Sequence, residues 1–267
     1  MKMILATGNM GKLKEARLIF SGIKDCGVEI ISPLEASCNM SGIEETGSTF
    51  FENALIKAKA VWERTHVPAI ADDSGLIVEA LSGEGVRAFY EGEKRGFPDG
   101  FEEPRENLYP GVVTARFFDT VSSLFGYPSK KDEHPFLYGA LAEKPGEEET
   151  MSILSDVEEN VVSGDKNEMN YRLLLSLLDG EKSRKAFFVS CCAAYFGDGR
   201  YVSSYGICCG SISEKPFVAN GFGYDPVFFL DGMGMMISEL SDAEKNAISH
   251  RGKAMRRLGE KLALIKN

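Results

Sequence analysis

The sequence contains no apolar run of about eighteen residues, the shortest length that suits a membrane-spanning helix. Its first residues, Met1 to Ala6, form too short an apolar segment for a signal peptide. We therefore expect no association with a membrane and retention in the cytoplasm.

Cysteine occurs at six positions, and no two of them have the C-x-x-C spacing that is typical of zinc sites. Two adjacent pairs, Cys191-Cys192 and Cys208-Cys209, account for four of the six. Outside the secretory pathway such cysteines stay reduced. The sequence therefore predicts neither a disulfide framework nor structural zinc.

Acidic residues outnumber basic ones: the sequence contains 40 Asp and Glu and 30 Lys and Arg, which gives a formal net charge of -10. Proteins that bind nucleic acid polymers rely on many phosphate contacts from basic residues. This balance argues against such a partner, but it permits a small phosphorylated ligand held by a few lysines.

The chain of 267 residues, 43% of them hydrophobic, is long enough to fold around a substantial core. Predicted helices and strands intermix along it, which indicates an α/β fold with a mixed sheet. Residues 82–111 show no clear periodicity and are expected to form an excursion or lid. Strands are expected at 3–6, 28–32, 67–71, 185–196, 201–209 and 227–230, and helices after residue 12 and at 49–64, 147–160, 169–178 and 253–266.

A glycine-containing turn, Thr7-Gly8-Asn9-Met10-Gly11-Lys12, connects the first strand to the first helix. Free N–H groups at a helix N-terminus and a nearby lysine both favour an anion. The turn lacks the spacing of a Walker A loop. It is a candidate phosphate site of another kind.

Two adjacent carboxylates, Asp72 and Asp73, follow the strand expected at 67–71. The carboxyl ends of strands in open α/β sheets are where ligands bind. If the two side chains converged to about 4 Å, they would repel by roughly 4 kcal/mol at an effective dielectric near 20. A magnesium ion would relieve that repulsion. The alternative is a helix start that is capped by Asp73.

The helix expected at 49–64 begins with a capping box, Thr49-Phe-Phe-Glu52, and carries Asn53 and Lys57 four residues apart on one face. Lys57 is either a site residue or a solvated surface charge.

A third cluster lies near the C-terminus, where Gly221-Phe-Gly-Tyr-Asp-Pro226 forms a tight turn before a strand. Ser241 caps a short helix that could carry Lys245, and His250 and Arg251 come at or near the start of the last helix. Together these residues indicate a ligand site. Taken singly, Phe222 and Tyr224 could be core aromatics, His250 a structural residue and Arg251 a surface charge.

These motifs together, with Glu45-Thr-Gly47 and Ala71-Asp-Asp-Ser-Gly-Leu76, resemble the inosine/xanthosine triphosphate pyrophosphatase family in content and order. The resemblance implies an elongated α/β protein with a long, mixed, twisted sheet flanked by helices and two lobes around a central cleft. It also implies a Mg²⁺-dependent homodimer. The implied reaction splits a non-standard purine nucleoside triphosphate (ITP, dITP or XTP) into monophosphate and pyrophosphate and so cleanses the nucleotide pool.

The resemblance also assigns roles to individual residues. Asp73 looks like the proton acceptor and Lys57 like an assisting lysine, while Glu45 and Asp73, with Asp72 close by, look like the metal ligands. Phe222 can stack on the purine, and Arg251 and backbone N–H groups can donate to its 6-oxo group. The implied nucleotide-binding set is Thr7, Gly8, Asn9, Met10, Gly11, Lys12, Ser74, Phe222, Gly223, Tyr224, Asp225, Lys245, His250 and Arg251.

Two segments depart from the family pattern. In the family, a Pro-Gly-Val motif normally comes directly after the segment that corresponds to Ala80-Leu-Ser-Gly83. Here that motif is matched either by the degenerate Gly85-Val-Arg-Ala-Phe-Tyr90 or, better, by Tyr109-Pro-Gly-Val-Val-Thr-Ala-Arg116. Residues 83–109 are therefore expected to be an insertion near the cleft. The segment 128–160 is also longer than the family needs. We expect residues 1–267 to form one domain that carries both insertions.

Two other functions fit parts of the pattern. One is a Maf-like pyrophosphatase that acts on pyrimidine or modified nucleotides. The other is a non-catalytic purine-nucleotide sensor that uses the insertions to contact a partner. Intact Asp72, Asp73, Lys12 and Lys57 weigh against a sensor, which has no need of a metal and water site.

Overall fold

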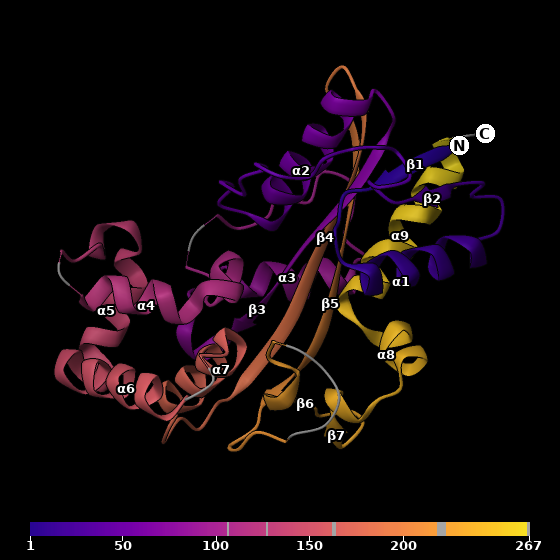
Figure 1. Cartoon of the computed structure of the whole chain (residues 1–267). Coiled ribbons are helices and arrows are strands. Elements are labelled where there is room, and N and C mark those ends of the chain that lie inside the picture. The colour runs from indigo at the N-terminus through magenta and orange to yellow at the C-terminus, as the bar shows by residue number, and fades with distance from the viewer. Residues whose placement is uncertain (106, 127, 162–163, 218–222, 266–267) are drawn as a thin grey trace.

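One mixed sheet of seven strands, in the order β2-β1-β3-β4-β5-β6-β7, runs through the molecule (Figure 1). The computed structural model describes residues 1–105, 107–126, 128–161, 164–217 and 223–265. The strands are β1 (Lys2–Leu5), β2 (Glu29–Ile31), β3 (Ala69–Val78), β4 (Lys185–Gly197), β5 (Arg200–Ile212), β6 (Phe228–Leu230) and β7 (Met235–Met236). The α/β class with a mixed sheet is confirmed.

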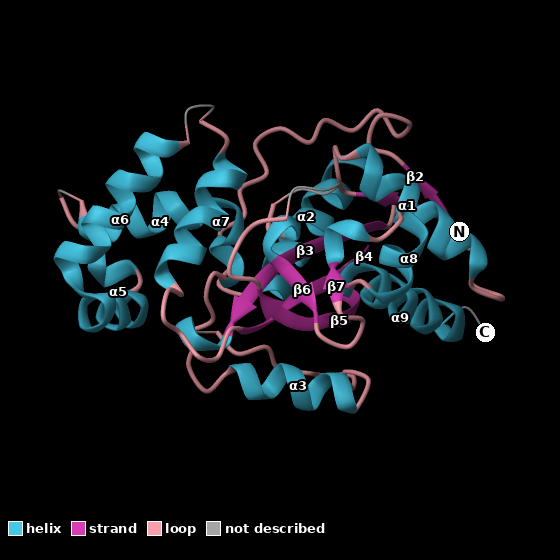
Figure 2. Ribbon diagram, turned by 90° about the horizontal axis from the view of Figure 1, so that it is seen from below, coloured by secondary structure: helices cyan, strands magenta, loops and turns pink. Residues whose placement is uncertain are grey.

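Most helices lie in two groups: in the views of Figures 1 and 2, α4 to α7 lie to the left of the long strands and α1, α8 and α9 to the right. The helix α3 lies apart from both groups, along another side of the sheet (Figure 2). The helices are α1 (Met10–Gly22), α2 (Phe50–Thr65), α3 (Val86–Lys94), α4 (Phe117–Phe125), α5 (Pro135–Leu141), α6 (Glu147–Asn160), α7 (Lys166–Leu177), α8 (Asp242–Ile248) and α9 (His250–Ile265).

The sheet changes direction at β3. Strands β1 and β2 pair in parallel, as do β1 and β3, whereas β3, β4, β5, β6 and β7 pair antiparallel in turn. The hairpin between β4 and β5 turns at Asp198 and Gly199, whose φ angles are +52° and +74°. Positive φ at both central residues suits the twist of a two-residue hairpin.

Strand β3 is longer than the sequence predicted. It was expected to end at Ala71 with Asp72 and Asp73 beyond it, but it continues to Val78 because all ten of its residues have a partner in β4. Pairing along a 13-residue neighbour supplies the backbone hydrogen bonds that a short strand would have left unmade. Both carboxylates therefore lie within the strand, and the alternative of a helix capped by Asp73 is wrong.

Successive residues of β3 point to opposite faces of the sheet. Ile70 contributes to the apolar cluster beneath α1 and α9, and Leu76 to the cluster beneath α4 to α7. On the other face, Ala71 lies with the residues of α2, and Ile77 with those of α3. Asp72 and Ser74 thus interrupt the apolar surface of one face, and Asp73 interrupts that of the other.

The predicted caps explain where two helices begin. Thr49 accepts a hydrogen bond from the Glu52 N–H at the start of α2, although the Glu52 carboxylate reaches the Ser48 N–H instead of closing the box on Thr49. Ser241 and Glu244 form the complete capping box of α8. Each such cap supplies partners to N–H groups that the helix cannot satisfy.

Three helices were not predicted: α3, α4 and α5. Val86 and Phe89, three residues apart, are buried in α3, but the helix has only nine residues and the glycines and prolines around it obscured its period. The segment 82–111 is therefore partly helical. The helix expected around 147–160 is present as α6.

No helix within the described residues has the length and apolar character needed to cross a membrane. All six cysteines are free, as predicted.

Substituting Gly206 tests how closely α9 approaches the sheet. A Cβ at this position would lie 2.3 Å from the carbonyl oxygen of His250 and 2.7 Å from the backbone nitrogen of Ala254. Gly206→Ala must push α9 off β5 and should lower the free energy of unfolding by about 2 kcal/mol in urea denaturation. Gly139→Ala, where the new Cβ meets open space, is the control and should not destabilise the protein. Equal stability of the two variants would contradict the close packing.

Candidate functional site

Asp72 joins three elements that are far apart in the sequence. Its Oδ2 lies 2.8 Å from Lys12 Nζ of α1 and 3.1 Å from Arg251 Nε of α9. The hydroxyl of Ser74 also donates to Oδ2 at 3.3 Å and lies 3.0 Å from the hydroxyl of Ser190 on β4. The carboxylate is almost wholly buried, with 2% of its side chain exposed.

The two cations determine the charge of this carboxylate. Burial alone would raise the pKa of Asp72, but Lys12 and Arg251 outweigh it and hold that pKa well below its ordinary range. Glu15 of α1 lies 3.5 Å from Arg251 Nη1, and burial raises its pKa. Asp72 is therefore a permanent anion that fixes two cations at neutral pH.

Asp73 forms a second cluster on the opposite face. Lys57 Nζ lies 3.1 Å from Asp73 Oδ1 and 3.1 Å from Glu45 Oε2, so that the ammonium bridges the two carboxylates. Asn53 Nδ2 donates to Asp73 Oδ2 at 3.2 Å. Asn53 and Lys57 share a face of α2, as their spacing predicted.

The site changes the pKa values of both Asp73 and Lys57. Burial raises the pKa of Asp73 to about 6, with Lys57 opposing the shift and Glu45 adding to it. Burial acts against the charge of Lys57, but Asp73, Asp72 and Glu45 raise its pKa overall. Asp73 can therefore exchange a proton near pH 6, while Lys57 remains an ammonium.

The Asp73 cluster has the chemistry of a magnesium site with few protein ligands. Glu45 and Asp73 supply oxygen ligands that share one lysine, and their like charges contribute to the raised pKa of Asp73. Within the described parts of the chain, no three His, Cys, Asp or Glu side chains gather as a complete metal cage. Mg²⁺ commonly uses one or two carboxylates together with water and substrate phosphates, so this donor set fits it.

The turn at residues 7–12 leads into α1 as predicted. Asn9 is its N-cap, with Oδ1 accepting from the N–H groups of Gly11 at 2.8 Å and Lys12 at 3.2 Å. Thr7 Oγ1 accepts from the Asn9 N–H at 3.1 Å. Met10 is largely exposed.

A cavity of about 470 Å³ brings this turn together with the C-terminal cluster. Its walls come from α1, α8 and the start of α9. A volume of this order suits a small ligand. The charged and polar residues that line it are Asn9, Lys12, Lys14, Glu15, Asp242, Lys245, Asn246, Ser249, His250 and Arg251.

The C-terminal residues are partly engaged with one another. Lys245 Nζ lies 2.6 Å from Asp225 Oδ2. His250 stacks on Phe188 with ring centroids 5.0 Å apart, and burial lowers its pKa well below the ordinary range, so its imidazole is neutral at pH 7. No described residue gives its buried Nδ1 a hydrogen bond.

Tyr224 is a core residue. It is 3% exposed, packs in the cluster beneath α4 to α7, and donates from its hydroxyl to the Thr114 carbonyl oxygen at 3.2 Å. Gly223 has a φ of +64°, as a tight turn requires. Phe222, the residue expected to stack on the purine, lies outside the described residues.

Three residues of the two clusters were not among the predicted site residues: Glu15, Asn53 and Ser190. Glu15 follows Lys12 by one helical turn, and Asn53 precedes Lys57 by one turn, so helical spacing could have found both. Ser190 could not be found this way, because only the register between β3 and β4 brings it opposite Ser74.

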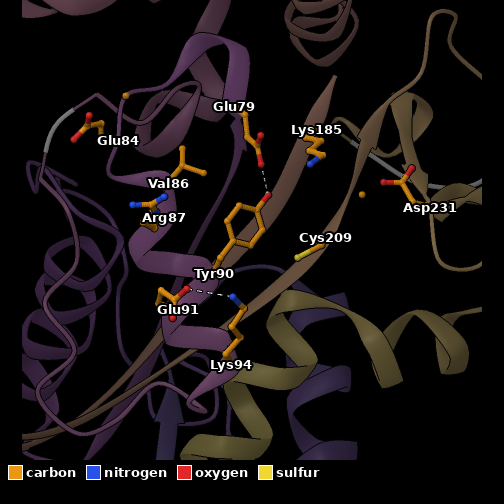
Figure 3. A pocket seen from close by; sticks show the side chains of 12 residues that line it. Glu79, Glu84, Val86, Arg87, Tyr90, Glu91, Lys94, Lys185, Cys209 and Asp231 are labelled. Atoms are coloured by element: carbon orange, nitrogen blue, oxygen red, sulfur yellow. Dashed lines mark hydrogen bonds and ion pairs between the residues drawn. The ribbon is translucent and has the colours of Figure 1, made fainter. Parts of the chain in front are cut away.

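The largest cavity described lies elsewhere, beside α3 and the ends of β4 and β5, with a volume of about 1020 Å³ (Figure 3). None of the predicted site residues lines it. Its polar groups are partly paired with one another: Tyr90 donates to Glu79 at 2.7 Å, and Lys94 forms an ion pair with Glu91 at 3.2 Å (Figure 3). The chemistry expected from the sequence therefore lies away from this cavity.

A comparison with known families identifies the family of the chain. The model of the Ham1 family matches residues 3–95 and 140–261, which include both carboxylates of β3 and the residues of α1, α2 and α9 that contact them. The chain belongs to the Ham1 family. The match leaves out residues 96–139 of this Ham1 protein.

Relatives of this Ham1 protein are similar over almost their whole length. The dITP/XTP pyrophosphatase of Aquifex aeolicus is 37% identical, with 97% of this chain and 95% of that protein covered. The dITP/XTP pyrophosphatase of Haemophilus influenzae is 33% identical, with 98% of each covered. The family expected from the sequence is thereby confirmed.

Solved structures of the Ham1 family share the fold. A HAM1 protein from Coxiella burnetii is 27% identical and superposes with a TM-score of 0.64, with 99% of each chain covered. The nucleoside-triphosphatase, dITP/XTP pyrophosphatase, from Mycobacterium abscessus is 30% identical with a TM-score of 0.58, and 97% of this chain and 98% of that one are covered.

Replacing Asp72 tests its role as the link between α1 and α9. In Asp72→Asn, Lys12 and Arg251 lose the anion that neutralises them, so the free energy of unfolding should fall by about 3 kcal/mol in urea denaturation with chelator present. The folded pKa of Asp72 lies below its ordinary value of 3.8. The stability difference should therefore be complete above that pH and shrink as the pH falls below it.

The control for this measurement is Asp119→Asn, which removes an exposed ion pair with Lys166. It should change stability by less than about 1 kcal/mol. A difference between wild type and Asp72→Asn that stays constant down to pH 2 would contradict the assigned charge of Asp72.

Proposed function

We propose that the protein is a magnesium-dependent nucleoside-triphosphate pyrophosphatase that converts dITP, ITP and XTP to the monophosphate and pyrophosphate. One observation carries the proposal. The cations fixed by Asp72 line a cavity of ligand size, and the next residue of the strand, Asp73, belongs to a carboxylate and lysine cluster suited to Mg²⁺. The two clusters lie on opposite faces of β3, but β1 pairs with β3 only through Ile4 and Leu5. Among the described residues no strand therefore covers that edge of β3 at Asp72 and Asp73, and a triphosphate can reach both clusters there.

The triphosphate is bound by the turn at residues 7–12 and by the start of α9. N–H groups at the start of α1 and the ammonium of Lys12 offer hydrogen bonds and positive charge to phosphate oxygens. Arg251 adds a second cation beside Lys12, since both contact Asp72 Oδ2 and line the cavity. Thr7, Asn9, Ser74 and the residues between Thr7 and Lys12 complete the predicted phosphate contacts.

Glu45 and Asp73 would hold the metal. When bound there, Mg²⁺ neutralises phosphate charge and so lowers the cost of charge that develops on the leaving group. The salt bridges of Asp72 favour a role in fixing Lys12 and Arg251, so we assign the metal to the other two carboxylates.

Asp73 acts as the proton acceptor for the attacking water. A carboxylate with a pKa near 6 is close enough to neutral pH to serve as a general base. The water oxygen forms a bond to the α phosphorus, the bond from that phosphorus to the bridging oxygen breaks, and its electrons leave with pyrophosphate. Lys57, held as an ammonium, stabilises the charge that develops.

The purine lies against the C-terminal cluster. Arg251 and backbone N–H groups can donate to a 6-oxo group, and Lys245 and His250 also line the cavity. Adenine carries a 6-amino group, which would set donor against donor and leave buried groups unpaired. The resemblance predicts that Phe222, Gly223, Tyr224 and Asp225 lie near the base.

A homodimer and a place in the cytoplasm belong to the same proposal. The homodimer comes from the resemblance to the pyrophosphatase family, and hydrolysis of stray nucleotides is useful where nucleic acids are made. Light scattering on the purified protein measures the mass of the assembly directly.

Hydrolysis of a panel of nucleotides tests the proposal. The protein is incubated with dITP, ITP, XTP, GTP, ATP and dTTP, with Mg²⁺ or with chelator, and the products are separated. We expect metal-dependent release of pyrophosphate from dITP, ITP and XTP far above that from GTP and ATP. Asp73→Asn should lower kcat by about 100-fold or more, because the water loses its base.

The control is again Asp119→Asn, which should keep full activity. Preferred turnover of dTTP would favour the Maf-like alternative. Tight binding of ITP without turnover of any nucleotide would favour the sensor and contradict the proposal.

A further inference from the structure

We propose that Glu103 is a positioning residue for the reaction site, because its carboxylate fixes the first turn of α2 and thereby holds Asn53 and Lys57 against Asp73. Glu103 lies between α3 and the 3-10 helix at residues 111–116, in the part of the chain that the Ham1 family model does not match. The expected effect on kcat rests on the proposed function, whereas the expected effect on α2 rests on the contacts of Glu103 alone.

The contacts of Glu103 are bidentate. Its Oε1 accepts from the Phe50 N–H at 2.8 Å, and its Oε2 accepts from the Phe51 N–H at 2.9 Å. These are the first two residues of α2, whose N–H groups have no partner within the helix. Thr49 satisfies the third N–H, that of Glu52, so two side chains together complete the helix start. A carboxylate at this end also meets the positive end of the helix dipole.

The segment that carries Glu103 is anchored to the sheet. Phe101 packs edge-on against Phe97 and Tyr205, with ring centroids 4.9 Å apart in both pairs. The Tyr205 hydroxyl then donates to Glu103 Oε2 at 3.1 Å. The carboxylate is therefore held from β5 on one side while it holds α2 on the other.

The same turn of α2 leads directly to the reaction site. Asn53 follows Phe51 by two residues, accepts from the Gly47 N–H at 2.8 Å and donates to Asp73 at 3.2 Å. One turn further on, Lys57 bridges Asp73 and Glu45. A shift of the first turn would move both side chains relative to Asp73.

The pH at which Glu103 ionises separates its role in positioning α2 from its effect on the stability of the protein. Burial raises its pKa to about 7, against the opposing hydrogen bonds from Phe50, Phe51 and Tyr205, and the charge of Asp73 adds to the shift. Because the folded pKa lies above the ordinary 4.5, the associated stability is complete below pH 4.5 and is lost as the pH rises through 7.

The ionised carboxylate that accepts both N–H groups is thus present above pH 7 at a cost to stability. The titratable groups that face Glu103 are Tyr205 and Cys191 from the sheet and Asp73 across the cluster.

Kinetics at pH 8 with dITP and Mg²⁺ form the first arm of the test. Glu103→Gln places an amide NH₂ against a backbone N–H, so we expect kcat to fall by about 10-fold or more from misplacement of α2. KM should stay within about 3-fold, because Lys12 and Arg251 are untouched. Glu103→Asp keeps the charge on a shorter side chain and should recover part of kcat. Glu102→Gln makes the same substitution at the exposed neighbouring residue; it is the matched control and should behave as wild type.

Amide NMR forms the second arm and needs no turnover. In the wild-type protein, the backbone N–H signals of Phe50 and Phe51 should titrate together with a midpoint near pH 7 and move upfield as Glu103 is protonated. In Glu103→Gln this titration should be absent, and the side-chain NH₂ signals of Asn53 should shift at pH 8. Glu102→Gln should leave both observations unchanged.

The two arms separate this inference from the proposed function. Shifted Asn53 signals with a lowered kcat in Glu103→Gln support it. Unchanged Asn53 signals or an unchanged kcat in Glu103→Gln would each overturn it. If the wild-type protein hydrolyses no nucleotide, the proposed function fails, and the NMR arm alone decides whether Glu103 positions α2.

Discussion

Consecutive side chains of a β-strand must point to opposite faces, and the site is built on this constraint at Asp72 and Asp73. One carboxylate is turned towards α1 and α9, where it fixes two cations. The next is turned towards α2, where it shares a lysine with Glu45. A single dipeptide thus connects a basic cavity for a triphosphate to an acidic cluster for a metal and a water molecule, without bringing the two buried carboxylates together.

The rest of the fold serves this arrangement by keeping β3 rigid. Antiparallel pairing with β4 along the whole strand fixes the register, so that Ser190 lies opposite Ser74. Strand β5 pairs with the other edge of β4. Helix α9 then lies so close to β5 that Gly206 leaves no room for a Cβ. That approach sets the position of His250 and Arg251, the first two residues of the helix. A misplaced α9 would remove one of the two cations from Asp72.

Local signals in the sequence predicted the parts of the site better than their assembly. The caps at Thr49 and Ser241, the turn before Lys12 and the helical spacing of Asn53 and Lys57 are encoded within a few residues, and the structure contains them all. The length of β3 could not be predicted locally, because it depends on pairing with β4 more than a hundred residues away. For the same reason the sequence suggested that Asp72 and Asp73 follow a strand, when they lie within one. Tyr224 shows a further limit, since the sequence alone could not decide whether this residue lines the ligand site or packs in the core.

Hydrolysis of dITP in water labelled with oxygen-18 tests most directly whether water attacks the α phosphorus. The products of a single turnover are separated, and the label in each is measured by mass spectrometry. The account predicts one labelled oxygen in the monophosphate, unlabelled pyrophosphate and no orthophosphate. Label in pyrophosphate, or release of orthophosphate, would place the attack at another phosphorus and contradict the proposed geometry of the site.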